Sequence, residues 1–214
     1  MNKLFFTENP VMAFLRRLTN FMILSVIWWL CCIPVITVIP ATCSLYYVTL
    51  KLAKKEEVPI IKTFFRGFKM NFKQGIILFF IFAAIGIVFF VDYVAFSTMD
   101  TMINSVASSL FVVLMVCLLS TILYTCALQA QFTNSIGGTL KNAFLLSVQK
   151  LKDTIVILIV HFLPVIFALV FSNIFMKALP VVIVLAPAGM AYVCSVRFVK
   201  IFAPLIPAPE NPEP

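Results

Sequence analysis

Two long apolar stretches follow one another in the middle of the chain, at residues 75–96 and 105–131. Asp92 is the one charged side chain that they contain. Because a helix rises about 1.5 Å per residue, about 20 apolar residues cross the ~30 Å hydrocarbon core of a bilayer. A soluble domain of this size needs no two such stretches in succession, and two more follow. We therefore expect an all-α, polytopic integral membrane protein.

The composition supports a single membrane-embedded domain. The chain is 63% hydrophobic and 11% charged, against roughly 45–50% and 25% in soluble domains. No hydrophilic stretch is long enough for a second domain, so we assign residues 1–203 to one domain. Residues 204–214 contain five prolines, which predicts a flexible tail. Arg16 and Arg17 directly precede the first apolar run, and no small-residue cleavage site closes it, so we expect no cleavable signal.

The first apolar stretch, residues 18–53, is too long for one span and is interrupted by Pro34 and Pro40. Proline disfavours helix at the residue before it and fits the first turn of a helix. We therefore expect a helical hairpin in which residues 10–33 and 40–54 form two helices. The remaining membrane helices are expected at residues 75–96, 105–131, 154–172 and 179–202.

The positive charges predict how these helices are oriented, because Lys and Arg concentrate in cytoplasmic loops. Seven cations lie in residues 51–73, three lie in residues 132–153, and Arg197 and Lys200 lie near the C-terminus. The loop at 97–104 has no cation. Six helices with both termini in the cytoplasm satisfy every loop. The alternative is five spans, with residues 40–54 at the membrane surface and the N-terminus outside.

Residues 59–73 have the pattern of an amphipathic helix at the membrane interface. Phenylalanines and Ile61 are expected on the side opposite to four cations, which are spaced 4, 3 and 4 residues apart: Lys62, Arg66, Lys69 and Lys73. Aromatic rings among acyl chains and cations toward headgroups are typical of interfacial helices. We expect this basic face to contact anionic lipid or a protein partner, and no nucleic acid. Residues 139–151 predict a second interfacial helix.

His161 is a candidate intramembrane polar site, because an ionisable residue at membrane depth often serves a function. Pro164 cannot donate an N–H group, which leaves a carbonyl near this histidine. The alternative is a neutral imidazole hydrogen-bonded to a neighbouring helix. Gln129, Gln131 and Asn134 are expected at the cytoplasmic interface.

The motifs of common enzymes are missing from the sequence, which has no H-E-x-x-H, G-x-S-x-G or P-loop pattern. The six cysteines all lie in apolar segments without C-x-x-C spacing. They are interpreted as small apolar side chains, with a disulfide or a metal site as the alternative. We expect a non-enzymatic protein without catalytic residues, cofactor or metal.

Three segments together resemble a known family. Residues 40–51 (PATCSLYYVTLK), 64–74 (FFRGFKMNFKQ) and 142–148 (NAFLLSV) are similar to the YesL family of bacterial membrane proteins, in the same order along the chain. The family has no established biochemical activity, so no catalytic residues carry over. Its genes often neighbour those of carbohydrate-uptake transporters and polysaccharide utilisation.

The resemblance implies a multi-pass protein of the bacterial cell membrane that assists carbohydrate uptake by contacting a transporter or sensor. The alternative is a small-solute transporter, acting alone or as an oligomer. A transporter should contain a continuous polar cavity between its helices, whereas an accessory protein should have a closed bundle and act through its surface.

Overall fold

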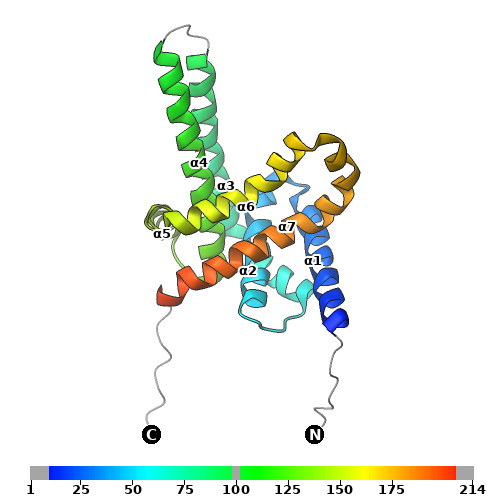
Figure 1. Ribbon diagram of the computed structural model, residues 1–214. Helices are drawn as coiled ribbons and strands as arrows, with labels where there is room; N and C mark the ends of the chain where they lie inside the picture. The colour runs from blue at the N-terminus through cyan, green and yellow to red at the C-terminus, as the bar shows by residue number, and fades with distance from the viewer. Residues whose placement is uncertain (1–9, 98–101, 206–214) are drawn as a thin grey trace, which may run out of the picture.

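The computed structural model describes residues 10–97 and 102–205, and these residues form helices and no strands (Figure 1). Short 3-10 turns lie at Val35–Thr37 and Ala203–Leu205. The α-helices are α1 (Pro10–Cys32), α2 (Val38–Ala53), α3 (Ile60–Ser97), α4 (Met102–Gln131), α5 (Ile136–Gln149), α6 (Leu151–Val170) and α7 (Ser172–Phe202). Within the described part, all but α5 belong to segments long and apolar enough to cross a membrane. The expected all-α, multi-pass architecture is confirmed; residues 206–214 of the expected tail lie outside the described residues.

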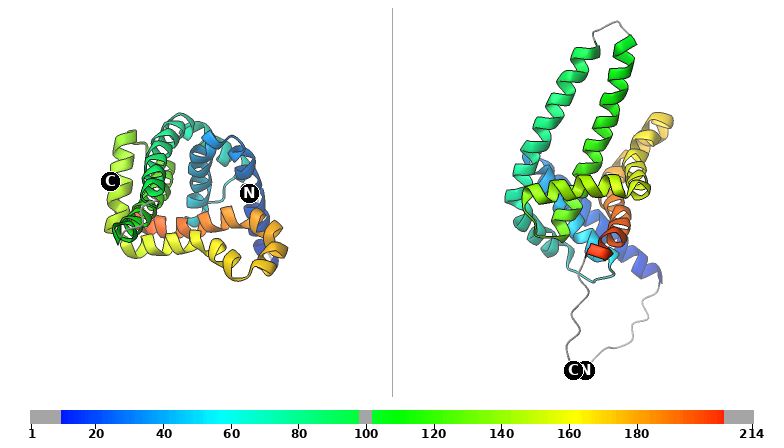
Figure 2. Two further views of the ribbon diagram at one scale, coloured as in Figure 1. Left: turned by 90° about the horizontal axis from the view of Figure 1, so that it is seen from above. Right: turned by 90° about the vertical axis from the view of Figure 1, so that its left-hand side faces the viewer.

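Two helical hairpins define the outline of the molecule. The helices α3 and α4 form a long antiparallel hairpin that extends beyond the other helices (Figures 1 and 2). The helices α6 and α7 lie side by side and cross the direction of that hairpin at a steep angle. The helix α5 lies across the base of the hairpin, beside α4 (Figure 2).

The central helix is α2, which contacts α1, α3, α4 and α7. In the apolar segment that contains α2, residues 35–53, 61% of the residues are buried inside the protein, a larger share than in any other candidate span. A helix at the membrane surface keeps one side exposed to water and headgroups. Because α2 is surrounded by other helices, the structure favours six membrane helices over five spans with a surface segment at 40–54.

An aromatic cluster closes the centre of the bundle. The ring of Phe198 in α7 is fully buried, and its centroid lies 5.6 Å from Tyr46 of α2 and 5.0 Å from Tyr124 of α4. Both pairs are edge-to-face, which is a favourable geometry for aromatic rings. Phe202, one turn further along α7, stacks on Phe198 at 5.5 Å. Three helices distant in sequence are therefore joined through one side chain.

The helix α3 is continuous over 38 residues, so the prediction of a surface helix at 59–73 separate from a span at 75–96 was wrong. Gly75 does not end the helix but lets α2 approach: a Cβ atom there would lie 2.7 Å from Cγ of Pro40. About two turns earlier, a Cβ on Gly67 would lie 2.9 Å from the Tyr47 ring. Close packing against α2 therefore stabilises the helix through the expected break.

The second predicted surface helix is a separate element, since α5 ends before α6 begins at a turn around Lys150 (φ −107°, ψ 46°). The hydroxyl of Thr154 lies 2.8 Å from the carbonyl oxygen of Ser147 across this turn. The hydroxyl of Tyr124 in α4 lies 2.9 Å from the Thr154 hydroxyl. These contacts fix the angle at which the chain leaves α5.

A proline interrupts the backbone hydrogen bonds in the middle of α7, and side chains of α1 supply replacement partners. Pro187 has no N–H group to donate to the carbonyl of Ile183, and the indole N–H of Trp29 donates to that oxygen at 2.9 Å. The next amide, that of Ala188, donates to the hydroxyl of Ser25 at 3.1 Å. Backbone groups at membrane depth need such partners because water is absent. The two hydrogen bonds attach α1 to α7.

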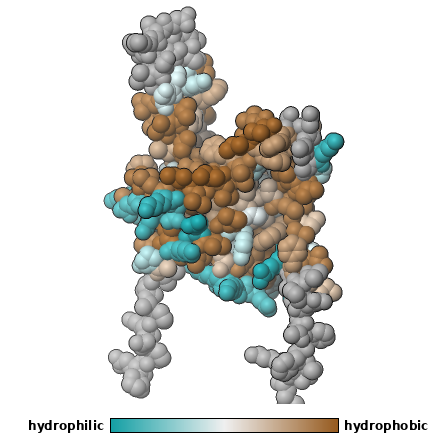
Figure 3. All heavy atoms as spheres, in the orientation of Figure 1, coloured by the Kyte–Doolittle hydropathy of each residue, from teal (hydrophilic) through white to brown (hydrophobic). Residues whose placement is uncertain are grey.

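The connections fall at two ends of the molecule. The start of α1, the loop between α2 and α3, and the end of α7 lie at the lower end in Figure 1. The tips of both long hairpins lie toward the other end. Hydrophilic residues gather at the lower end and over α5, while hydrophobic residues cover much of the surface between the ends (Figure 3). Both described chain ends thus lie on one side, as six crossings require.

Candidate functional site

Polar side chains line one side of α4 inside the bundle. Thr121, Thr125 and Gln129 follow each other at four-residue intervals, and all three are buried. Residues four apart share one face of a helix, so these side chains form a polar stripe toward the protein interior. The spacing is visible in the sequence, but the expectation that Gln129 lies at the interface missed it.

Gln129 connects three helices. Its side-chain amide donates to Oε1 of Gln74 in α3 at 3.2 Å, and the thiol of Cys43 in α2 donates to its Oε1 at 3.9 Å. The amide of Gln74 in turn donates to the carbonyl of Asn134, in the connection between α4 and α5, at 3.4 Å. The glutamine therefore uses both ends of its amide to hold neighbouring elements together.

Further polar contacts lie around the aromatic cluster. The hydroxyls of Thr49 in α2 and Ser195 in α7 are 2.8 Å apart and fully buried. The hydroxyls of Tyr46 and Thr125 are buried without a hydrogen-bond partner among the described residues. Thiols of three helices lie near Tyr46, and thiols are weak hydrogen-bonding groups: those of Cys43, Cys126 and Cys194.

His161 lies in α6, partly buried, as its sequence position suggested. Its Nδ1 donates to the carbonyl of Ile157 in the same helix at 2.9 Å and lies 3.8 Å from the thiol of Cys194 in α7. The carbonyl that Pro164 leaves free, that of Val160, is not its hydrogen-bond partner. Over residues 10–97 and 102–205, no three His, Cys, Asp or Glu side chains gather as ligands of a metal ion.

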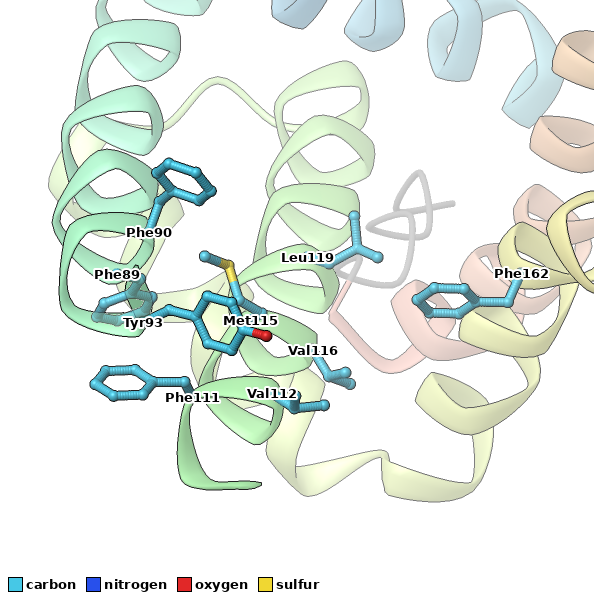
Figure 4. A pocket seen from close by; sticks show the side chains of 9 residues that line it. All are labelled: Phe89, Phe90, Tyr93, Phe111, Val112, Met115, Val116, Leu119 and Phe162. Atoms are coloured by element: carbon cyan, nitrogen blue, oxygen red, sulfur yellow. The ribbon is translucent and has the colours of Figure 1, made fainter. Parts of the chain in front are cut away.

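One cavity among the described residues is apolar. It lies between α3, α4 and α6 and has a volume of about 550 Å³. In Figure 4, side chains of α3 and α4 line it on one side and Phe162 of α6 lies on the other. The lining residues are Phe89, Phe90, Tyr93, Phe111, Val112, Met115, Val116, Leu119 and Phe162. Such a surface suits hydrocarbon chains or apolar side chains and offers little to a polar solute.

The four predicted cations lie on the first half of α3, and all are exposed: Lys62, Arg66, Lys69 and Lys73. The aromatic side of this segment is divided. Phe64 is fully buried against the core, whereas Phe65 and Phe72 remain exposed. The face that packs on the bundle is made instead by Phe64, Gly67 and Asn71. The expected two-sided helix therefore has three sides: packed, apolar and basic.

Comparison with known proteins gives one match, to a family described as "Protein of unknown function, DUF624", over residues 21–93. No curated protein and no solved structure matches the chain. The chain is similar to this family across the second half of α1, all of α2 and most of α3. The matched residues include the glycine contacts between α2 and α3 and the four exposed cations.

Proposed function

We propose that this protein is a non-enzymatic integral membrane protein that acts through its surface, assisting carbohydrate uptake by contacting a membrane transporter or sensor. The observation that carries the proposal is that polar side chains of the interior are hydrogen-bonded to one another, whereas the cavity offers little polar lining for a solute. The polar side chains of the bundle bond to one another across α2, α3, α4 and α7, and the cavity is apolar. Carbohydrate as the substrate class rests on the resemblance to the YesL family alone.

The alternative function is transport of a small solute by the protein itself. It is favoured by the unpartnered hydroxyls of Tyr46 and Thr125 and by the proline-opened segment of α7. Polar groups and interrupted helices near the midplane are typical of transporters. Against it, these hydroxyls adjoin packed side chains, and the described cavity lies elsewhere, between α3, α4 and α6.

Uptake measurements separate the two functions. In a strain lacking the gene, uptake of at least one class of labelled mono- or oligosaccharide should fall and should recover when the full chain is restored. The purified protein in liposomes should not accelerate entry of the same sugar, because an accessory protein needs its transporter. Entry into liposomes that contain this protein alone would contradict the accessory function and support the alternative. If the uptake of every labelled sugar tested is unchanged in the strain lacking the gene, the proposed link to carbohydrate would be refuted.

We also propose that the lower end of the molecule faces the cytoplasm of a bacterial cell, with both termini inside. Single cysteines can be placed in a background without the six native ones. An impermeant thiol reagent should label Val35→Cys and Lys177→Cys in intact cells but leave Glu57→Cys unlabelled. Val35 decides the number of spans, since it lies outside with six helices and inside with five. Protection of Val35→Cys together with labelling of Lys177→Cys would refute the six-helix topology.

A further inference from the structure

The four exposed cations of α3 have no partner among the residues that the structure describes, whereas three other cations of the lower end do. Lys51 pairs with Glu56 at 3.2 Å, Lys54 donates to Gln131 at 3.0 Å, and Arg197 pairs with Asp153 at 3.5 Å. Across residues 10–97 and 102–205, no hydrogen bond or ion pair involves the four cations of the basic face, Lys62, Arg66, Lys69 and Lys73. Four positive charges therefore remain available to an outside anion.

The position of this basic face relative to the membrane follows from the continuity of α3. The helix is about 57 Å long by its rise, nearly twice the hydrocarbon thickness, and its apolar part begins directly after Gln74. Lys73 is thus next to the start of the membrane span. Because the basic segment is joined to this span without a break, its cations begin at the level of the headgroups.

An exposed apolar side borders the basic face. On a helix with 3.6 residues per turn, Ile61, Phe65 and Phe72 fall between the packed face and the cations. Their exposed fractions are 53%, 50% and 39%. Exposed phenylalanines beside cations are the arrangement of helices at the boundary between acyl chains and headgroups.

We propose that the basic face of α3 binds anionic lipid headgroups of the leaflet at which this helix enters the membrane, with the neighbouring phenylalanines in the acyl boundary. The four cations are distributed over about 16 Å along the helix, which one phosphate group cannot span. Several headgroups are required. The exposed apolar side favours lipid over an acidic peptide segment, since a peptide would leave it uncovered. The proposal is independent of the function in carbohydrate uptake.

Lipid selection by the full-length protein tests this assignment. The protein is reconstituted in bilayers of phosphatidylglycerol and phosphatidylcholine in equal amounts, gently extracted, and its bound lipids are counted by native mass spectrometry. Each cation near an anionic surface strengthens binding by about fivefold. Replacement of all four by Gln should therefore lower the preference for phosphatidylglycerol by more than about tenfold. High salt should weaken the preference of the unaltered protein.

Two matched variants distinguish the basic face from net charge and from misfolding. Replacing Arg17, Lys55, Lys177 and Lys200 by Gln removes the same charge elsewhere and should retain most of the preference. Replacing Lys62, Lys69 and Lys73 by Arg keeps the charge and should retain the preference fully. An unchanged preference in the four-Gln variant of the basic face would overturn the proposal, as would an equal loss in the scattered variant. If the four-Gln variant keeps its lipid preference, the cations would instead be expected to bind an acidic protein partner.

Discussion

Replacement of Phe198 by alanine should lower the free energy of unfolding by on the order of 3 kcal/mol, as truncations of buried phenylalanines do. The side chain is fully buried and contacts the rings of Tyr46, Tyr124 and Phe202. Alanine would leave a cavity where α2, α4 and α7 meet, and it would remove three aromatic contacts at once. Thermal or denaturant unfolding in one detergent gives the measurement.

Phe80 supplies the control, because its side chain on α3 is 60% exposed. Its replacement by alanine should change the stability by less than about 0.5 kcal/mol, as is usual for surface positions. If both variants lose the same stability, the aromatic cluster is not the centre of the bundle. Phe198→Leu should fall between the two, since leucine fills part of the space.

The length and apolar character of the helices were sufficient to predict the membrane class. Helix α1 was expected at residues 10–33 and is observed at Pro10–Cys32, because its ends are marked by Pro10 and by Pro34 just beyond it. Helix α7 was expected to start at residue 179, yet it begins at Ser172. Lys177 and Pro180 both lie inside this helix, although a cation and a proline between two apolar runs are typical of a loop.

The error in α3 has a physical reason. From the sequence alone, a change from basic and aromatic residues to a purely apolar run, with Gly75 between them, resembles a boundary between two helices. Whether glycine ends a helix or admits a neighbour depends on what packs there, and only the position of Pro40 decides it. A contact between two residues 35 positions apart, such as Pro40 and Gly75, cannot be predicted from the local sequence pattern.

The polar interior was hidden for a related reason. The regular spacing of Thr121, Thr125 and Gln129 identifies one polar side of α4, but the sequence does not say which helix faces it. The partners Cys43 and Gln74 come from α2 and α3. The basic face could be predicted from the sequence, because four cations at helical spacing are a local feature. That Phe64 is buried, unlike the exposed phenylalanines beside the basic face, could be seen only from the packing of α3 in the structure.

Replacement of Gly75 by alanine should destabilise the protein by about 1–3 kcal/mol, the usual cost of overpacking. The added Cβ would lie 2.7 Å from Cγ, 2.9 Å from Cδ and 3.0 Å from Cα of Pro40. A proline ring can change only its pucker and cannot turn away, and its Cα belongs to the backbone of α2. The two helices would have to separate along their whole contact. Unfolding in detergent, together with expression level in the membrane, measures this loss.

The other glycines of α3 provide a graded comparison within one helix. Gly67→Ala should cost less, because the Tyr47 ring that it meets at 2.9 Å is a side chain that can turn away. Gly86 has no atom within 4 Å of an added Cβ, so Gly86→Ala should be neutral or stabilise the helix by up to roughly 1 kcal/mol. The expected order of stability is Gly86→Ala, then Gly67→Ala, then Gly75→Ala. Equal effects at all three positions would show that α2 does not pack against α3 through these glycines, and the central position of α2 would then be wrong.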